Sequence, residues 1–138
     1  MNERLTPSES YTYITKNGKE ISIQIYNSVD EIPQVIYEQI VDLILLGGAV
    51  ERSGLESRLR NVVRFQLAFD KKKLIGILAL KRPLKVYKRM IAKKARLKGR
   101  ELEEFNKVEY EAGYLVVHPL YRGMGIADRL NFYLPDIK

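Results

Sequence analysis

Residues 110–130 have the sequence YEAGYLVVHPLYRGMGIADRL, and this stretch decides the predicted fold. Apolar and β-branched residues dominate positions 108–117, which predicts a buried strand. Pro119 ends that strand, because proline cannot donate a hydrogen bond to a sheet. Gly123 and Gly125 follow in a loop, and a helical pattern begins at the second glycine. The stretch therefore predicts a strand, a glycine-containing loop and a helix, in that order.

The two glycines give this loop a chemical property. At a helix N-terminus, exposed backbone N–H groups and the positive end of the helix dipole attract anions. Gly123 and Gly125 have no side chain that would hold a phosphate away from the backbone. Arg122 adds a fixed positive charge that can make paired hydrogen bonds to phosphate oxygens. A phosphorylated ligand is therefore the predicted occupant.

The segment also resembles the pyrophosphate-binding motif of the GNAT superfamily of N-acyltransferases. The family motif is Arg or Gln, any two residues, Gly, any residue, and then Gly or Ala. The matching residues here are Arg122, Gly123, Met124, Gly125, Ile126 and Ala127. The strand Leu115-Val116-Val117, the exit His118-Pro119 and Tyr121 directly before the arginine strengthen the resemblance. It is specific over residues 108–131 and implies an α+β fold with a mixed, mostly antiparallel sheet flanked by helices.

The resemblance implies acetyl-CoA as the cosubstrate. The backbone amides from Gly123 to Ala127 would hold its pyrophosphate. The backbone of Leu115, Val116 and Val117 would pair with the pantetheine arm, and an amide near Val117 would polarise the thioester carbonyl. Stabilisation of a developing oxyanion in this way is often the largest single catalytic contribution. The implied activity is that of an N-acetyltransferase, which transfers the acetyl group directly to a primary amine of an unidentified acceptor.

An amine must lose a proton before it attacks, so a general base is expected. In some family members a glutamate six residues before the end of this strand has that role, and the matching residue here is Glu111. Glu109 lies on the same face, because side chains alternate along a strand. Both carboxylates could instead pair with nearby Lys or Arg side chains at the strand end. We interpret His118 as a turn residue, and Tyr114 and Tyr121 as packing residues.

The sequence before this stretch predicts a hairpin, helices and two further strands. Alternating residues over 11–26 indicate the hairpin, and Asn17-Gly18 is typical of a type I′ turn. Ser28 and Glu31 have the spacing of a capping box for a helix that Gly47-Gly48 ends. The remaining predicted elements are a short helix over 54–61, a strand with one buried face over 63–69 and a more apolar strand over 74–80. These elements predict a single α+β domain over residues 1–138.

Composition excludes several classes of protein. The chain has 138 residues, of which 46% are hydrophobic and 30% charged, which argues against a disordered or collagen-like chain. It has no cysteine, so disulfides, thiolate metal sites and cysteine nucleophiles are excluded. With His118 as the single histidine, we expect no metal site. No apolar run approaches the roughly 20 residues of a membrane-spanning helix, so we expect no membrane contact and a cytoplasmic protein.

The net charge of +7 is concentrated in one segment. Ten basic residues and no acid lie between Lys81 and Arg100, and the rest of the chain has 14 basic against 17 acidic residues. We expect residues 84–107 to form a basic helical insertion between two strands. It could recruit an acidic or phosphorylated acceptor, or it could be a solvated helix whose lysines cover an apolar stripe. The alternative function is a non-catalytic acyl-CoA-binding module whose basic insertion binds nucleic acid or an acidic partner.

Members of the GNAT superfamily continue past the motif helix with a strand, a helix and two more strands. Here the sequence stops at Lys138, eight residues after Leu130, so we expect a GNAT-like domain that lacks the usual C-terminal strands. The motif strand would then have an unpaired edge. Three explanations stay open: a truncated chain, completion by another chain such as a homodimer partner, and a shortened non-catalytic relative.

Overall fold

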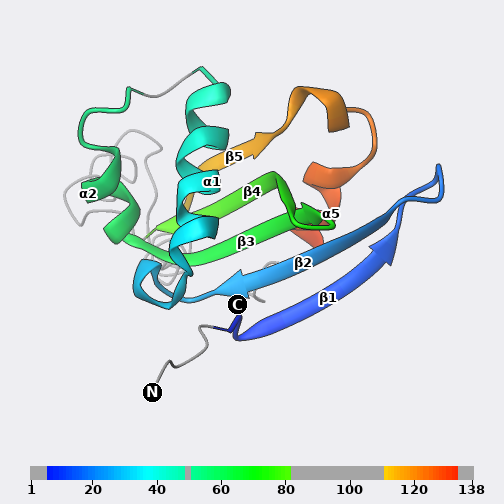
Figure 1. Cartoon of the computed structure of the whole chain (residues 1–138), viewed down its shortest axis with the longest axis horizontal. Helices are drawn as coiled ribbons and strands as arrows, with labels where there is room; N and C mark the ends of the chain where they lie inside the picture. Colours follow the sequence, from blue (N-terminus) through cyan, green and yellow to red (C-terminus); the bar gives the residue numbers. More distant parts are fainter. Residues whose placement is uncertain (1–5, 49–50, 82–110, 134–138) are drawn as a thin grey trace, which may run out of the picture.

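The computed structural model describes residues 6–48, 51–81 and 111–133, and it has an α+β architecture. Within these ranges, five strands form one antiparallel sheet in the order β1-β2-β3-β4-β5, so each strand pairs with its neighbour in sequence. The strands are β1 (Glu9–Ile14), β2 (Glu20–Tyr26), β3 (Val62–Asp70), β4 (Lys73–Lys81) and β5 (Glu111–Val117). The α-helices in the described ranges are α1 (Gln34–Leu46), α2 (Leu55–Arg60) and α5 (Ile126–Phe132). Helices α1 and α2 cover one face of the sheet, and α5 covers the other (Figure 1).

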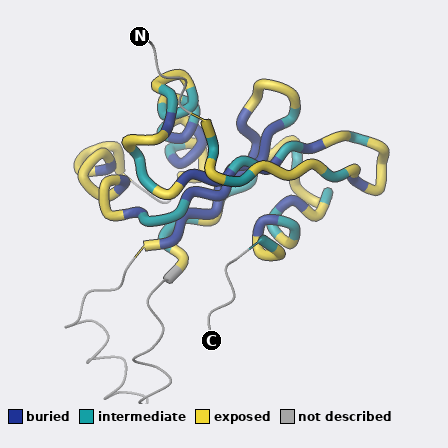
Figure 2. The backbone as a smooth tube through the Cα atoms, turned by 90° about the horizontal axis from the view of Figure 1, so that it is seen from below, coloured by how far each residue is buried: buried dark blue, intermediate teal, exposed yellow. Residues whose placement is uncertain are grey.

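The sheet separates two apolar clusters. The larger cluster lies between the sheet and helices α1 and α2, and Ile40 and Phe65 are fully buried in it. The smaller cluster lies between the sheet and α5, and it contains Ile75, Ile126 and Leu130. In Figure 2 the middle of the sheet is buried, whereas the turns at its ends are exposed. Burial of apolar surface on both faces therefore fixes the positions of the helices relative to the strands.

β3 and β4 are buried on both faces. The prediction that residues 63–69 bury only one face was wrong, because every residue from Phe65 to Phe69 is buried. Helix α5 covers the face that the polar alternation had assigned to solvent. Gln66 is consequently fully buried beneath this helix.

β1 and β2 form the predicted hairpin, but its turn is not of type I′. The Thr15 amide donates to the Lys19 carbonyl at 2.8 Å, and the Gly18 amide donates to the Thr15 carbonyl at 2.9 Å. A type I′ turn needs two residues with positive φ, and in this turn only Gly18 has one, at 85°. The loop therefore has three residues, Lys16 to Gly18, which is the geometry of a type I turn followed by a left-handed glycine.

Helix α1 begins later than the capping-box pattern predicted. A 3-10 turn (Val29–Glu31) comes first, and Pro33 is the N-cap of α1. The Ser28 side chain makes no capping hydrogen bond, and Glu31 Oε2 instead accepts from the Asn27 amide at 2.9 Å. Pro33 explains the delay, because the residue before a proline is disfavoured in the helical conformation.

The other predicted elements agree with the described structure. α1 ends before Gly47-Gly48, α2 lies within 54–61, and β4 includes the predicted strand over 74–80. Glu109 and the predicted basic insertion over 84–107 lie outside the described residues.

Candidate functional site

The loop between β5 and α5 has open space around its two glycines. β5 leads through a 3-10 turn (Pro119–Tyr121) into Arg122, and α5 begins directly after Gly125. Gly123 and Gly125 have φ values of 80° and 77°, a left-handed conformation that glycine adopts without strain. A Cβ atom at either position would meet no atom within 4 Å. The predicted order of strand, loop and helix is confirmed, and a ligand can approach the backbone at both glycines.

Backbone amides at the start of α5 are available for hydrogen bonding. Gly125 is the N-cap of α5, and it makes no side-chain capping bond. No described residue accepts a hydrogen bond from the amides of Gly125, Ile126 and Ala127. The side chains of Ile126 and Leu130 are buried against the sheet, which holds this turn in place. With the exposed Arg122 beside them, these amides provide hydrogen-bond donors and a positive charge to the same region.

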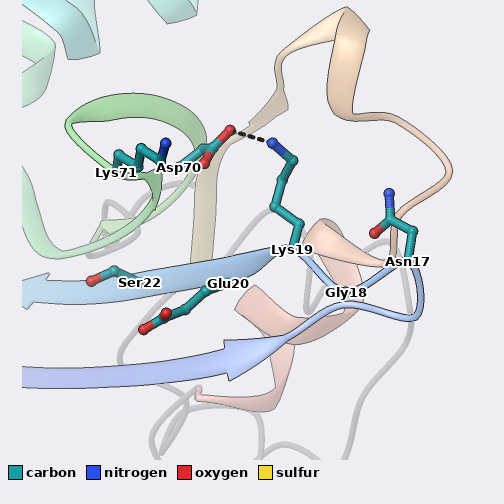
Figure 3. A pocket seen from close by; sticks show the side chains of 7 residues that line it. All are labelled: Asn17, Gly18, Lys19, Glu20, Ser22, Asp70 and Lys71. Atoms are coloured by element: carbon teal, nitrogen blue, oxygen red, sulfur yellow. Dashed lines mark hydrogen bonds and ion pairs between the residues drawn. The ribbon is translucent and has the colours of Figure 1, made fainter.

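A hydrogen-bonded cluster ties this loop to two hairpin turns. Tyr121 Oη donates to Asp70 Oδ2 at 2.6 Å, and Lys19 Nζ donates to the same oxygen at 2.9 Å. Figure 3 shows Lys19, beside the β1–β2 turn, and Asp70, at the end of β3, pointing toward one another. The Nζ atoms of Lys19 and Lys73 lie 5.7 and 5.8 Å from the centroid of the Tyr121 ring. One tyrosine therefore connects the glycine loop to both hairpins.

This cluster shifts the pKa values of its members. The hydrogen bond from Tyr121 makes the largest contribution to lowering the pKa of the Asp70 carboxyl, and the hydrogen bond from Lys19 makes the next largest. The bond to Asp70 raises the pKa of Tyr121 and that of Lys19. At neutral pH the three groups therefore keep the carboxylate, phenol and ammonium forms that their hydrogen bonds require.

An open pocket of about 600 Å³ lies beside the Lys19–Asp70 pair (Figure 3). Its lining residues are Asn17, Gly18, Lys19, Glu20, Ser22, Asp70 and Lys71. Two lysines and two carboxylates line it, so their charges balance and favour neither an anion nor a cation.

His118 is a turn residue, as predicted. Its backbone amide donates to the Ile75 carbonyl at 2.8 Å, which continues the pairing of β5 with β4 by one residue. Its Nδ1 atom accepts from the Leu120 amide at 3.2 Å and so caps the 3-10 turn. This ring nitrogen is therefore engaged in shaping the turn.

β5 is an edge strand within the described part of the sheet. It pairs with β4 on one side, and no described strand pairs with its other side. The prediction of a buried strand was wrong for this part of the chain, because no residue from Ala112 to Val117 is buried and Leu115 is 47% exposed. Tyr114 and Val116 pack against the larger cluster, and Val117 packs against the smaller one. The strand is thus anchored from both faces, and its outer backbone groups pair with no strand in the part of the chain that the structure describes.

The two predicted catalytic positions lie at opposite ends of β5. Val117 pairs with Gly76 and adjoins the glycine loop, whereas Glu111 pairs with Lys81 at the far end. The strand between them spans about 20 Å, at roughly 3.3 Å per residue. β5 therefore does not bring the two positions to one reacting group, and the side chain of Glu111 lies outside the described structure.

A partly buried hydrogen-bond network fixes the C-terminal end of α5. Gln66 Nε2 donates to the Leu130 carbonyl at 2.6 Å, and Gln66 Oε1 accepts from Arg64 Nε at 2.8 Å. Arg64 also donates to the Tyr133 carbonyl at 3.0 Å and pairs with Glu9 at 3.2 Å. These bonds satisfy carbonyl groups that the end of a helix leaves unpaired. They therefore hold the helix that follows the glycine loop.

Sequence patterns did not identify Asp70, Arg64 or Gln66 as residues that support the candidate site. Alternation along a strand assigned the last two to the solvent face. Their contacts join β3 to residues 51 to 69 positions away, a separation over which local patterns carry no information. The available signal was Tyr121, which stands directly before Arg122 and has a hydroxyl that requires a partner.

No family model matches the chain, and the comparison with curated proteins also gives no match. In the described ranges, no cluster of acidic or histidine side chains is arranged to hold a metal ion. No α-helix in those ranges is both long enough and apolar enough to cross a membrane. The loop geometry and the residue pattern of 110–130 are therefore the basis for a functional proposal.

Proposed function

We propose that the chain is a GNAT-type N-acyltransferase that transfers an acetyl group from acetyl-CoA to a primary amine. The observation that carries this proposal is the pair of left-handed glycines, Gly123 and Gly125, with open space around them, in the loop that follows the edge strand β5. The glycines allow a pyrophosphate to reach the loop amides, and the edge strand offers backbone groups to an extended arm. Coenzyme A has both parts, because its pyrophosphate is joined to an arm with two amide groups.

Each proposed donor contact has a place in this arrangement. The pyrophosphate binds to the backbone amides of Gly123, Met124, Gly125, Ile126 and Ala127. Arg122 neutralises part of its charge. The pantetheine arm lies along Leu115, Val116 and Val117 on the outer side of β5, in the manner of an added strand.

The proposed chemistry is direct transfer. The amine nitrogen forms a bond to the thioester carbonyl carbon, the C–S bond breaks, the amine proton passes to a base, and the thiolate of coenzyme A leaves. A backbone amide of β5 stabilises the oxyanion, with Val117 nearest to the loop. If Glu111 is the base, the thioester must lie farther along β5, because Val117 and Glu111 occupy opposite ends of the strand.

Substitution of Glu111 tests whether this residue is the general base. We expect Glu111→Gln to lower kcat by about 10²- to 10⁴-fold and to leave donor affinity unchanged, because it removes the base but no donor contact. Steady-state kinetics and calorimetric binding of acetyl-CoA measure the two quantities. An unchanged kcat would assign proton removal to another group and would leave the reacting carbonyl near Val117.

Two glycines with the same geometry provide a matched test of donor binding. Gly54 is the N-cap of α2 and Gly125 is the N-cap of α5, both with φ of 77° and with no atom within 4 Å of an added Cβ. Gly54→Glu and Gly125→Glu therefore add the same backbone strain and the same charge. Only Gly125→Glu introduces a carboxylate at the proposed pyrophosphate site. We expect acetyl-CoA to raise the Tm of the wild type and of Gly54→Glu, but not of Gly125→Glu.

Transfer and binding are then distinguished by product analysis. Mass spectrometry of amine-bearing acceptors after incubation with isotopically labelled acetyl-CoA detects the transferred group. Thermal protection without transfer would favour a non-catalytic acyl-CoA-binding module. Absence of protection of the wild type by any acyl-CoA at high excess would contradict donor binding.

A further inference from the structure

The open pocket beside the Lys19–Asp70 pair shares no residue with the proposed donor contacts (Figure 3). It lies where the two hairpins of the sheet diverge. β2 pairs with β3 as far as Ser22 and Phe69, whereas within their own hairpins β2 continues to Glu20 and β3 to Asp70. The volume of about 600 Å³ is within the range of small-molecule sites. The divergence of the hairpins therefore leaves room for a ligand at this end of the sheet.

The lining of this pocket is polar throughout. Apart from Gly18, every lining residue has a side chain that ends in an amide, a hydroxyl, an ammonium or a carboxylate group. Most small-molecule sites are instead lined by apolar and aromatic side chains. A ligand in this pocket would therefore be bound through charges and hydrogen bonds, not through burial of apolar surface.

Two opposite charges remain without a partner on different sides of the pocket. Figure 3 shows Lys71 on the β3–β4 turn and Glu20 on β2. Lys19 and Asp70 pair with each other, but neither Lys71 nor Glu20 makes an ion pair or a side-chain hydrogen bond with any described residue. The pocket thus offers one available ammonium group and one available carboxylate, which are not within reach of each other.

The backbone of Lys71 is also unusual. Its φ of 58° is the only positive value at a non-glycine residue in the described ranges. Glycine adopts this left-handed conformation with less strain, and strained residues of this kind cluster at functional sites. A lysine at this position is therefore typical of a side chain with a role in binding.

We propose that this pocket binds a short peptide through its free ammonium and carboxylate ends. The peptide ammonium lies against Glu20 and its carboxylate against Lys71. The Asn17 side-chain oxygen accepts from the Thr15 hydroxyl, which leaves the Asn17 NH₂ group, together with the Ser22 hydroxyl, for the peptide groups between the two ends. This site goes beyond the proposed function, because acetyl-CoA carries no ammonium group.

Triglycine and two analogues that each lack one terminal charge test this recognition. In titrations of the ¹⁵N-labelled protein, triglycine should shift the amide resonances of Gly18 and Lys71. N-acetyltriglycine and triglycinamide should bind at least about tenfold more weakly, because each loses one charged hydrogen bond. Equal affinity for all three compounds, or no shift at millimolar triglycine, would overturn the proposal.

Neutralised variants assign each end of the peptide to one side of the pocket. We expect Lys71→Gln to weaken binding of triglycine at least about tenfold, but not to weaken binding of triglycinamide further. Glu20→Gln should likewise affect triglycine but not N-acetyltriglycine. Lys72→Gln is the matched control, because it removes the same charge from the same turn at a residue that does not line the pocket. Equal effects of Lys71→Gln and Lys72→Gln would reduce the effect to net charge and overturn the site.

Lys71→Gly gives a second readout that a purely structural role would not produce. Glycine relieves the left-handed strain, so we expect the Tm of the unliganded protein to rise. The affinity for triglycine should fall at the same time, because the ammonium group is lost. A higher Tm with unchanged affinity would contradict a binding role for Lys71.

The outcomes for this pocket and for the donor loop are separable. Gly125→Glu should bind triglycine as the wild type does. Triglycine binding by a wild-type protein that acetyl-CoA does not protect would support the pocket and contradict the proposed function. Protection by acetyl-CoA without triglycine binding would overturn the pocket and leave the proposed function intact.

Discussion

The two faces of the sheet are built in different ways. The face under α1 and α2 is an extensive apolar cluster around buried residues such as Ile40 and Phe65. The face under α5 has a smaller apolar cluster, and hydrogen bonds from Arg64, Gln66 and Tyr121 hold its edges. The glycine loop lies on the α5 side.

This difference assigns separate tasks to the two faces. Apolar packing is strong but not directional, so it stabilises the fold without fixing the position of a backbone amide precisely. Hydrogen bonds are directional, and those on this face fix the C-terminal end of α5 and the 3-10 turn before the glycine loop. We therefore expect changes on the α1 face to alter stability alone, and changes on the α5 face to alter stability and ligand binding together.

The largest expected effect comes from Phe65 on the α1 face. Phe65→Ala should lower the free energy of unfolding by about 3–5 kcal/mol, because it leaves a cavity in the larger cluster. Urea denaturation measures this loss. If that variant does not fold, Ile40→Val provides a milder test at about 0.5–1.5 kcal/mol. The affinity of the folded fraction for acetyl-CoA should be unchanged, and a parallel loss of affinity would contradict the separation of the two faces.

An intermediate effect is expected from Gln66 beneath α5. Gln66→Leu replaces the amide with an apolar side chain of similar size and leaves the Leu130 carbonyl and Arg64 Nε without their partner. The expected loss of stability is about 1–3 kcal/mol. Acetyl-CoA should also bind more weakly, because α5 is less well fixed. Gln24→Leu on β2 is the matched control, and an equal effect of the two substitutions on binding would argue against a positioning role for Gln66.

The smallest expected effect is a pH-dependent one at Asp70. Its lowered folded-state pKa means that its contribution to stability is present above the unfolded-state pKa and is lost as the pH falls through the folded-state value. Tyr121→Phe removes the main cause of the shift, so the Asp70 pKa should rise toward its ordinary range and acid unfolding should begin at a higher pH. Carboxyl NMR titration measures the pKa directly. Tyr26→Phe, whose hydroxyl bonds to Gln24, should leave the Asp70 titration unchanged.

Much of the fold could be predicted from local patterns. The first hairpin, the end of α1, the strands β3 and β4 and the strand–loop–helix order at Gly123 and Gly125 all follow from periodicity and turn residues. Two predictions, the type of the hairpin turn and the start of α1, were wrong for local reasons. Asn17 does not adopt positive φ, so the hairpin loop has three residues, and Pro33 delays the start of α1 beyond the Ser28 pattern.

The supporting contacts of the site could not be predicted in the same way. Asp70 lies at the end of β3, and its role depends on Lys19 and Tyr121, each 51 positions away. The strand pattern predicts that Gln66 faces solvent, but α5 covers it in the folded structure. The roles of these residues depend on tertiary contacts, which the residues next to them in sequence do not predict.

The central claim is that the glycine loop binds the donor through its backbone amides, and amide NMR tests it most directly. Spectra of the ¹⁵N-labelled protein are recorded during titration with acetyl-CoA. We predict that the largest chemical-shift changes occur at the amides of Gly123, Gly125 and Ala127. The amide resonance of Gly54, the left-handed glycine that caps α2, should not shift. The account would be contradicted if saturating acetyl-CoA left the resonances of the loop amides unchanged, or shifted the Gly54 amide resonance equally.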